Sequence, residues 1–268
     1  MISRRLRFPG GRGAELSGIL DLPEGREPVA FALFAHCFTC SKELKSVVAI
    51  NRVLTEQGIG VLRFDFTGLG ESGGDFSETG FTSTVDDLLA AASFLERSHA
   101  APSLLIGHSL GGTTCLAAAG AIKGCRAVVV IGSPASPAGL RHLFTGKEDE
   151  LAQNGSAQVM VAGRPFRLGR SFLDDVTGVR LEGAIATLGV PLLILHAPDD
   201  RVVGFHHAER IFSLAPQPRS LVALDRADHL LLAEEDARYA AGIIAAWAVR
   251  YLSPGPGAGG HHFRGVAP

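Results

Sequence analysis

The chain has 268 residues, of which 46% are hydrophobic, and it carries a formal net charge of −2 with an isoelectric point near 6.5. This composition suffices for one large buried core, and the absence of a basic block argues against a protein that binds nucleic acid or an anionic membrane. The first residues lack the apolar core of a signal peptide and the longest apolar run, residues 239–249, is too short to span a bilayer, so we predict a soluble, cytoplasmic protein whose partner is a small molecule.

The first half of the chain alternates strand and helix signals after an opening hairpin. Short apolar runs predict strands at residues 4–8, 15–22, 29–35, 61–64 and 104–106. A glycine-rich loop joins the first two runs and predicts an antiparallel hairpin. Helices are predicted at residues 42–57, ended by Gly58, and after Ser83, which we expect to act as the cap with Asp86 three residues on.

The second half of the chain continues the alternation. Further buried strands are predicted at residues 127–131, 192–195 and 221–224, and helices at residues 112–122 and 234–251. Strands that alternate with helices predict an α/β fold, in which a mostly parallel, twisted sheet is covered by helices on both faces. We therefore expect a single domain over residues 1–252.

Two segments stand outside this alternation. An insertion at about residues 136–190 is longer than an ordinary crossover. It contains a hairpin pattern, with strands at residues 158–160 and 166–168 and a turn at residues 163–165, so we predict a small cap over the site. The Pro/Gly-rich tail, residues 253–268, cannot bury enough apolar surface to order itself, and we predict that it is disordered.

A serine lies where the strand at residues 104–106 meets the helix that follows it. The motif Gly107-His108-Ser109-Leu110-Gly111 fits a tight strand-to-helix corner, in which bulky neighbours of the serine would collide with the strand and the helix. The motif alone is weak evidence, but a strand before it and a helix after it are the context that such a nucleophile requires. We predict that Ser109 is a catalytic nucleophile.

A serine hydroxyl needs a base to remove its proton and an acid to orient that base. His229 follows the last predicted strand on a loop that leads to the final helix, and we predict that it is the base. Asp199 and Asp200 follow the strand at residues 192–195, and the residue pattern leaves open which of the two is the acid. The chain order Ser, Asp, His is the order expected for this architecture, and Asp228 is expected to be structural.

Other motifs give weaker signals. The four cysteines form no disulfide framework, so free thiols are expected, and Cys37-x-x-Cys40 is a poor redox or zinc motif without a second pair. Residues 68–73 lack the third glycine of a dinucleotide loop. His206 and His207 are adjacent on a predicted helix and would point in different directions. We predict no cofactor and no metal.

Several segments together carry a resemblance to a known family. They are residues 34–42, residues 62–72, the corner around Ser109 and residues 163–166. Here the chain resembles the α/β-hydrolase superfamily, from about residue 14 to residue 252. It is most similar to the hydrolase half of bifunctional proteins that fuse this domain to an OsmC-like domain, and more distantly similar to cinnamoyl and feruloyl esterases.

The resemblance implies roles for particular residues. It implies that Asp200 rather than Asp199 is the acid, and that the backbone N–H groups of Phe38 and Leu110 stabilise an oxyanion. Cys37 is a departure, because many relatives have glycine at this position. The resemblance also implies a functional association with an OsmC-like domain, although no such domain follows residue 251 in this sequence.

These features predict a serine hydrolase that cleaves small or medium carboxylic esters through an acyl-enzyme. A peptidase or amidase, a thioesterase and an acyltransferase would use the same triad. From another class, the chain could be a binding module, or a redox partner that uses Cys37 and Cys40. Arg164, Arg167 and Arg170 in the cap would favour an anionic group on the substrate, unless they only face solvent.

Overall fold

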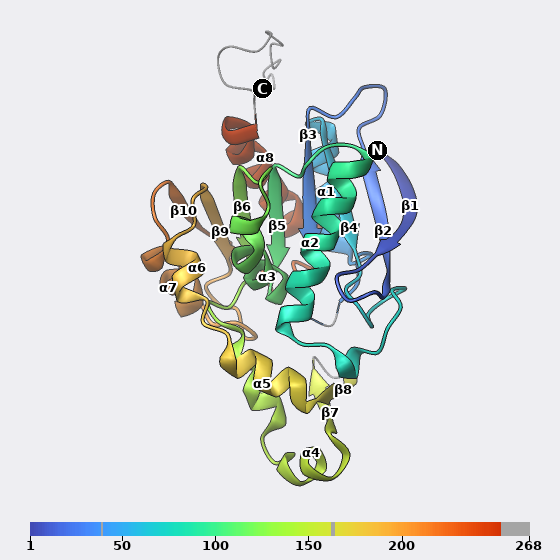
Figure 1. The fold of residues 1–268 in the computed structure, drawn as a ribbon. Coiled ribbons are helices and arrows are strands. Elements are labelled where there is room, and N and C mark those ends of the chain that lie inside the picture. Colours follow the sequence, from blue (N-terminus) through green and yellow to red (C-terminus); the bar gives the residue numbers. More distant parts are fainter. Residues whose placement is uncertain (39, 162–163, 253–268) are drawn as a thin grey trace.

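An eight-stranded sheet organises the protein in a computed structural model that describes residues 1–38, 40–161 and 164–252 (Figure 1). The strand order is β1-β2-β4-β3-β5-β6-β9-β10. The strands are β1 (Ile2–Pro9), β2 (Glu15–Leu22), β3 (Ala30–Ala35), β4 (Ile59–Phe64), β5 (Leu104–His108), β6 (Ala127–Ile131), β9 (Leu192–His196) and β10 (Arg219–Ala223). β2 is antiparallel to β1 and β4, and all other neighbours are parallel. The predicted hairpin and mostly parallel sheet are confirmed.

Helices cover both faces of this sheet, as predicted (Figure 1). On one face lie α1 (Lys45–Glu56) and α8 (Glu234–Leu252). On the other lie α2 (Phe81–Ser98), α3 (Leu110–Ala118), α6 (Glu182–Ala186) and α7 (His206–Leu214). The central strands are buried on both sides, which explains why their sequences are continuous apolar runs without alternation.

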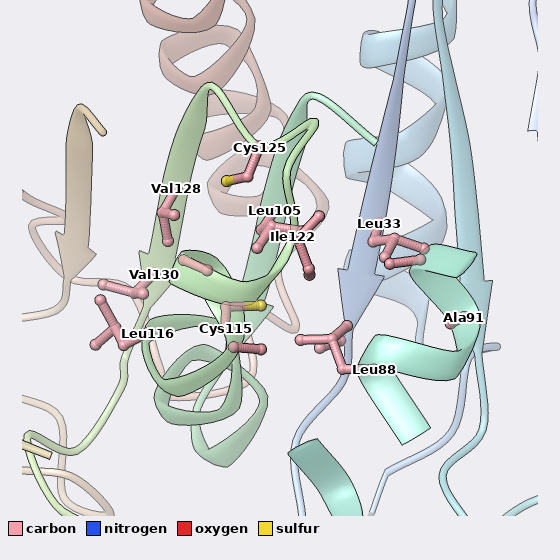
Figure 2. Packing of buried hydrophobic residues seen from close by; sticks show 14 of the residues in the cluster. Leu33, Leu88, Ala91, Leu105, Cys115, Leu116, Ile122, Cys125, Val128 and Val130 are labelled. Carbon is pink, nitrogen blue, oxygen red and sulfur yellow. The ribbon is translucent and has the colours of Figure 1, made fainter. Parts of the chain in front are cut away.

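Figure 2 shows how α2 and α3 pack on the sheet. Leu88 of α2 lies toward Leu33 of β3, and Leu116 of α3 lies toward Val130 of β6, and all four side chains are at most 1% exposed. Each such side chain contributes about 2 kcal/mol through removal of apolar surface from water. This packing holds α3, and with it the serine corner at its first turn, in a fixed position on the sheet.

Two helices begin at other residues than predicted. α1 begins at Lys45 rather than at residue 42, because the buried side chain and backbone N–H of Lys42 bind the carboxylate of Asp65 instead. α2 begins at Phe81, so Ser83 lies inside its first turn and its hydroxyl accepts the N–H of Gly80 at 2.8 Å. The prediction that Ser83 is the cap residue is therefore wrong.

The insertion after β6 forms a separate layer at the carboxyl edge of the sheet (Figure 1). It contains a 3₁₀ segment (Pro137–Phe144), α4 (Glu148–Asn154), the antiparallel hairpin of β7 (Ser156–Val161) and β8 (Arg164–Gly169), and α5 (Arg170–Gly178). We call these elements the cap. The predicted hairpin is present, and it is longer than the sequence indicated. The predicted tail, residues 253–268, and the predicted turn at residue 163 lie outside the described residues.

An apolar cluster joins the cap to the sheet. Phe144, Phe172 and Val176 of the cap pack with Phe38 and Leu110, which belong to the loop after β3 and to the start of α3. A polar contact adds to it, because the carboxylate of Asp175 in α5 accepts the backbone N–H of Thr82 at 2.6 Å in the first turn of α2. The cap therefore rests on the side chains of Phe38 and Leu110, the two residues whose backbone amides the resemblance implies as oxyanion donors.

Candidate active site

Ser109 occupies the corner between β5 and α3 with a φ of 54° and a ψ of −124°. Its N–H donates to the carbonyl of Ile131 at 2.8 Å, which ties the corner to β6. A Cβ at Gly107 would lie 2.4 Å from the carbonyl oxygen of Gly111, and one at Gly111 would lie 2.2 Å from the carbonyl oxygen of Ala35. Both glycines are therefore required by close backbone contact, and the strained serine is held by its surroundings.

The side chains of Ser109, His229 and Asp200 meet at the carboxyl edge of the sheet. His229 Nε2 lies 3.1 Å from Ser109 Oγ, and His229 Nδ1 lies 2.7 Å from Asp200 Oδ2. The His229 side chain is 9% exposed and that of Asp200 is 1% exposed, so the pair is largely shielded from water. One imidazole therefore connects a serine hydroxyl with a buried carboxylate, which is the geometry that general-base catalysis needs.

Of the two adjacent aspartates, only Asp200 points toward His229. Its second oxygen, Oδ1, accepts the N–H groups of Val202 and Val203 at 2.8 and 2.9 Å, whereas Asp199 is exposed. Burial opposes ionisation of Asp200, but the hydrogen bonds from His229 and from these backbone amides outweigh it and hold its pKa below the usual value. Asp200 is thus an anion at neutral pH, in contact with the imidazole.

The backbone amides of Leu110 and Phe38 are the two oxyanion donors that the resemblance implies, and both residues line one cleft. Leu110 is the first residue of α3, where an N–H has no partner inside the helix, and Phe38 lies in the turn after β3. Among the described residues, neither amide is paired with an acceptor. The amino end of α3 also carries the positive end of the helix dipole, which favours negative charge at this point.

The loop that carries Phe38 is closed by a disulfide. Cys37 and Cys40 are bonded to each other, with their Cα atoms 5.3 Å apart, and the N–H of Cys40 donates to the carbonyl of Cys37 at 3.2 Å. The prediction of free thiols is therefore wrong for this pair, because the turn brings the two residues within disulfide range. Cys115 and Cys125 are free and buried, and burial raises the pKa of the Cys125 thiol to about 12.

A buried ion pair fixes the other end of the same loop. Lys42 Nζ lies 2.6 Å from Asp65 Oδ2 and 2.7 Å from Glu71 Oε2, and Lys42 is 1% exposed. The N–H of Glu71 also donates to Asp65, at 2.9 Å. A buried charge is tolerated only when it is paired and hydrogen-bonded, so removal of either Lys42 or Asp65 would release the loop after β3 from the loop after β4.

Sequence reasoning missed several residues of the site. Gly132, the residue after β6, has a φ of +54°, and a Cβ there would lie 3.3 Å from His229 Nδ1 and 3.4 Å from Asp200 Oδ2. A glycine directly after a buried strand was the available signal. His36, His108 and His196 are also missed; they end or follow β3, β5 and β9 and are at most 4% exposed.

A small cleft lies beside the two backbone amides. Its volume is about 10 Å³, room for about one water molecule, and its walls include Phe38, Phe66, Phe76 and Leu110, with Thr114 at one side. The lining is mainly apolar and aromatic, as in sites that bind small organic groups.

Two of the three cap arginines, Arg167 and Arg170, are exposed. Arg167 bonds to Ser156 Oγ within the hairpin at 3.2 Å, and Arg170 begins α5. The side chain of Arg164 lies outside the described residues. The idea that these arginines bind an anionic substrate group stays a prediction.

The described part of the chain holds no cluster of three side chains of the metal-binding type. His207 Nδ1 accepts the N–H of Ala135 at 3.3 Å. In the same residues, no helix combines the length and the apolar character that crossing a bilayer requires.

Comparisons with known proteins agree with this fold. A model of the alpha/beta hydrolase family matches residues 32–261. The structure is similar to that of the esterase domain from a Rhodothermus marinus protein, with 45% identity, a TM-score of 0.78, and coverage of 94% of this chain and 100% of that one. It shares its fold with Est1E from Butyrivibrio proteoclasticus, solved with ferulic acid bound, at 20% identity, a TM-score of 0.78 and coverage of 92% and 99%.

The chain is also similar in sequence to other proteins. The chain is 26% identical to the uncharacterized protein YfhR of Salmonella typhimurium over 229 residues, which are 84% of this chain and 74% of that protein. It is 31% identical to the lysophosphatidylserine lipase ABHD12 of Xenopus tropicalis over 178 residues, which are 65% of this chain and 44% of the lipase. The fold, the serine corner and the matched family model lead to one conclusion: the chain is a hydrolase that belongs to the alpha/beta hydrolase family.

Proposed function

We propose that the protein is a serine hydrolase that cleaves small or medium carboxylic esters, with Ser109, His229 and Asp200 as its catalytic triad. The observation that carries this proposal is the pair of contacts made by His229, 3.1 Å to Ser109 Oγ and 2.7 Å to Asp200 Oδ2. These distances allow proton transfer from the hydroxyl to a base whose orientation is fixed by an anion.

In the first half of the reaction, Ser109 Oγ attacks the ester carbonyl carbon while His229 Nε2 takes the hydroxyl proton. Asp200 stabilises the imidazolium that forms. The tetrahedral intermediate then collapses, and the proton on His229 passes to the leaving alcohol. An acyl group remains on Ser109.

In the second half, His229 removes a proton from water, and the resulting hydroxide attacks the acyl-enzyme. The acid is released and Ser109 recovers its proton. The N–H groups of Phe38 and Leu110 are proposed to bind the oxyanion in both steps, since they have no acceptor in the described structure. This role uses only backbone atoms, which agrees with the apolar side chains at both positions.

The size of the substrate is inferred from the cleft and the cap. The cleft beside Phe38 and Leu110 has apolar and aromatic walls and a volume of only about 10 Å³, which favours a small apolar group over a long acyl chain. The 45% identical structure is named an esterase domain, which favours ester cleavage over amide cleavage. An amidase, a thioesterase or an acyltransferase would use the same triad, and the OsmC-like partner and the cytoplasmic location stay predictions.

A lysophospholipid is a second candidate substrate. The observation in its favour is the 31% identity to a lysophosphatidylserine lipase, although this chain spans less than half of that protein. Such a substrate is also a carboxylic ester, so the chemistry at Ser109 would be unchanged, and only the acyl length and the anionic head group would differ.

The experiment is a series of p-nitrophenyl esters of increasing acyl length, together with a feruloyl ester, a peptide amide and a lysophospholipid, assayed with the native chain and with Ser109→Ala. We expect the highest kcat/KM for short acyl groups, and a loss on the order of 10⁶-fold in kcat for Ser109→Ala. Equal rates for the two proteins, or no labelling of the native chain by a fluorophosphonate, would instead support a non-catalytic binding module.

A further inference from the structure

Buried histidines lie beside each part of the proposed catalytic machinery. His36 follows β3, His108 is the last residue of β5, and His196 is the last residue of β9. These strands end at the same edge of the sheet, and the three side chains are 1%, 4% and 0% exposed. None of them contacts Ser109 Oγ, so the mechanism described above does not use them.

Each of these imidazoles makes one short hydrogen bond, and the acceptor is a backbone carbonyl in every case. His36 Nδ1 lies 2.7 Å from the carbonyl oxygen of Cys37, His108 Nε2 lies 2.7 Å from that of His229, and His196 Nε2 lies 2.7 Å from that of Val203. A carbonyl oxygen can only accept, so each of these ring nitrogens must carry the proton.

The other ring nitrogen of each histidine has no hydrogen-bond partner in the described structure. These atoms are His36 Nε2, His108 Nδ1 and His196 Nδ1. Asp65 Oδ1 lies 3.7 Å from His36 Nε2, which is beyond hydrogen-bond distance. A neutral imidazole has a single N–H, so an unpartnered, unprotonated nitrogen fits a ring whose one proton goes to the carbonyl. Burial lowers the pKa of all three rings, that of His108 to about 3, and keeps them neutral.

The contact made by His36 bears on the oxyanion site. The carbonyl of Cys37 and the N–H of Phe38 belong to one peptide group, and a peptide group is planar. A hydrogen bond that fixes the direction of the carbonyl therefore also fixes the direction of the Phe38 N–H. His36 thus sets the orientation of one of the two proposed oxyanion donors.

The other two contacts bear on the base and the acid. His108 holds the backbone carbonyl of His229 itself, and the two rings lie 5.0 Å apart. His196 holds the carbonyl of Val203, whose N–H donates to Asp200 Oδ1 at 2.9 Å. One histidine therefore lies behind each of the three loops that meet Ser109.

We propose that His36, His108 and His196 are positioning residues, each of which donates its single ring N–H to a backbone carbonyl and so holds the oxyanion loop, the base loop or the acid loop in place. The proposal rests on the serine-hydrolase function proposed above. It predicts which nitrogen matters at each position: Nδ1 for His36, and Nε2 for His108 and His196.

Replacement by amides tests this prediction atom by atom. The side-chain NH₂ of asparagine lies near the position of Nδ1, and that of glutamine lies near the position of Nε2. We expect His36→Asn, His108→Gln and His196→Gln to keep kcat within about fivefold of the native value. We expect His36→Gln, His108→Asn and His196→Asn to lose about 10²-fold in kcat with little change in KM, because a misplaced group acts mainly in the transition state.

A matched control comes from the cap. His142 Nδ1 also bonds to a backbone carbonyl, that of Gly139 at 2.6 Å, but the ring is exposed and lies outside the triad loops. His142→Asn and His142→Gln should therefore both keep the native kcat. If asparagine and glutamine rank in the same order at all three buried positions, volume rather than the hydrogen bond decides, and the proposal is overturned.

A measurement on the native chain tests the proposal even if some of the variants do not fold. Proton-detected ¹⁵N spectra of histidine-labelled protein report the tautomer of each ring, and we expect Nδ1–H for His36 and Nε2–H for His108 and His196. The opposite tautomer at any of them would contradict the proposal. If the native chain hydrolyses no ester and is not labelled by a fluorophosphonate, the proposed function is refuted. If the native chain is active but its asparagine and glutamine variants have the same kcat, only this inference is refuted.

Discussion

The edge of the sheet and the cap contribute to the candidate site by different kinds of interaction. At the sheet edge, Ser109, Asp200 and His229 are held by hydrogen bonds of 3.1 Å or less to one another and to backbone groups. The cap is joined mainly through an apolar cluster, in which the ring of Phe172 lies 5.1 Å from that of Phe38.

We infer from this difference that the sheet edge determines the chemistry and that the cap determines substrate preference. Hydrogen bonds are directional, so the sheet edge fixes atoms relative to one another, as catalysis requires. Apolar packing depends on volume and tolerates rearrangement, so the cap can change shape while the reacting atoms stay in place. Changes at the sheet edge should therefore act on kcat, and changes in the cap should act on substrate preference and stability.

After Ser109→Ala, the largest effect at the sheet edge is expected from Asp200→Asn, which would favour the wrong tautomer of His229. We expect kcat to fall on the order of 10⁴-fold while the protein stays folded. The measurement is steady-state hydrolysis of a short p-nitrophenyl ester.

The neighbouring carboxylate provides the control. Asp199 is exposed and makes no contact with His229, so Asp199→Asn should change kcat by less than about twofold. A larger loss at Asp199 than at Asp200 would reverse the assignment of the acid.

A smaller effect is expected from Gly132→Ala. The added Cβ would lie 3.3 Å from His229 Nδ1, and the residue would be strained at a φ of +54°. We expect kcat to fall by about 10-fold to 10²-fold, because the imidazole must shift by a few tenths of an ångström. Gly13→Ala is the control for strain alone, since Gly13 has a φ of +89° and open space around it. If both variants lose the same fraction of kcat, the contact with His229 is unimportant.

In the cap, Phe172→Ala should leave a cavity in the cluster beneath α5. The side chain is 1% exposed, so we expect a loss of about 3–5 kcal/mol in the free energy of unfolding, together with a higher KM for aryl esters. Phe8→Ala is matched in burial, at 2% exposed, and packs on Phe94 far from the site. It should lose similar stability in urea unfolding but keep the native KM, and a changed KM there would contradict the separation of roles.

The triad residues at the sheet edge could be predicted from the sequence because each is marked by its neighbours in the chain. The glycines around Ser109 form a short motif between a strand and a helix, and the loops of Asp200 and His229 follow apolar strands that are readable as runs. The choice between Asp199 and Asp200 required coordinates, since adjacent residues on a loop differ only in direction. The structure turns one carboxylate toward His229 and leaves the other exposed.

The features that sequence reasoning missed depend on contacts between distant residues. Lys42 was expected in a helix, but its buried partner Asp65 lies 23 residues away in the chain. The sequence assigned no role to His108 within the serine motif, yet its acceptor is the carbonyl of His229, 121 residues later. No periodicity or spacing encodes such pairs, because each depends on which loops meet at the edge of the sheet.

The smallest of the expected effects concerns the pH dependence of stability at this same edge. Burial first, and then the neighbouring His229, lower the pKa of His108 to about 3 from an ordinary value near 6.5. Between these values the unfolded chain binds a proton that the native state does not, so the free energy of unfolding decreases as the pH falls, by about 1.4 kcal/mol per pH unit for this ring. His108→Gln removes that proton-binding site, and urea unfolding between pH 6.5 and 4.5 should show a shallower decrease than in the native chain. Equal slopes would mean that the native state accommodates a charged ring behind the base loop, which the unpaired Nδ1 of His108 argues against.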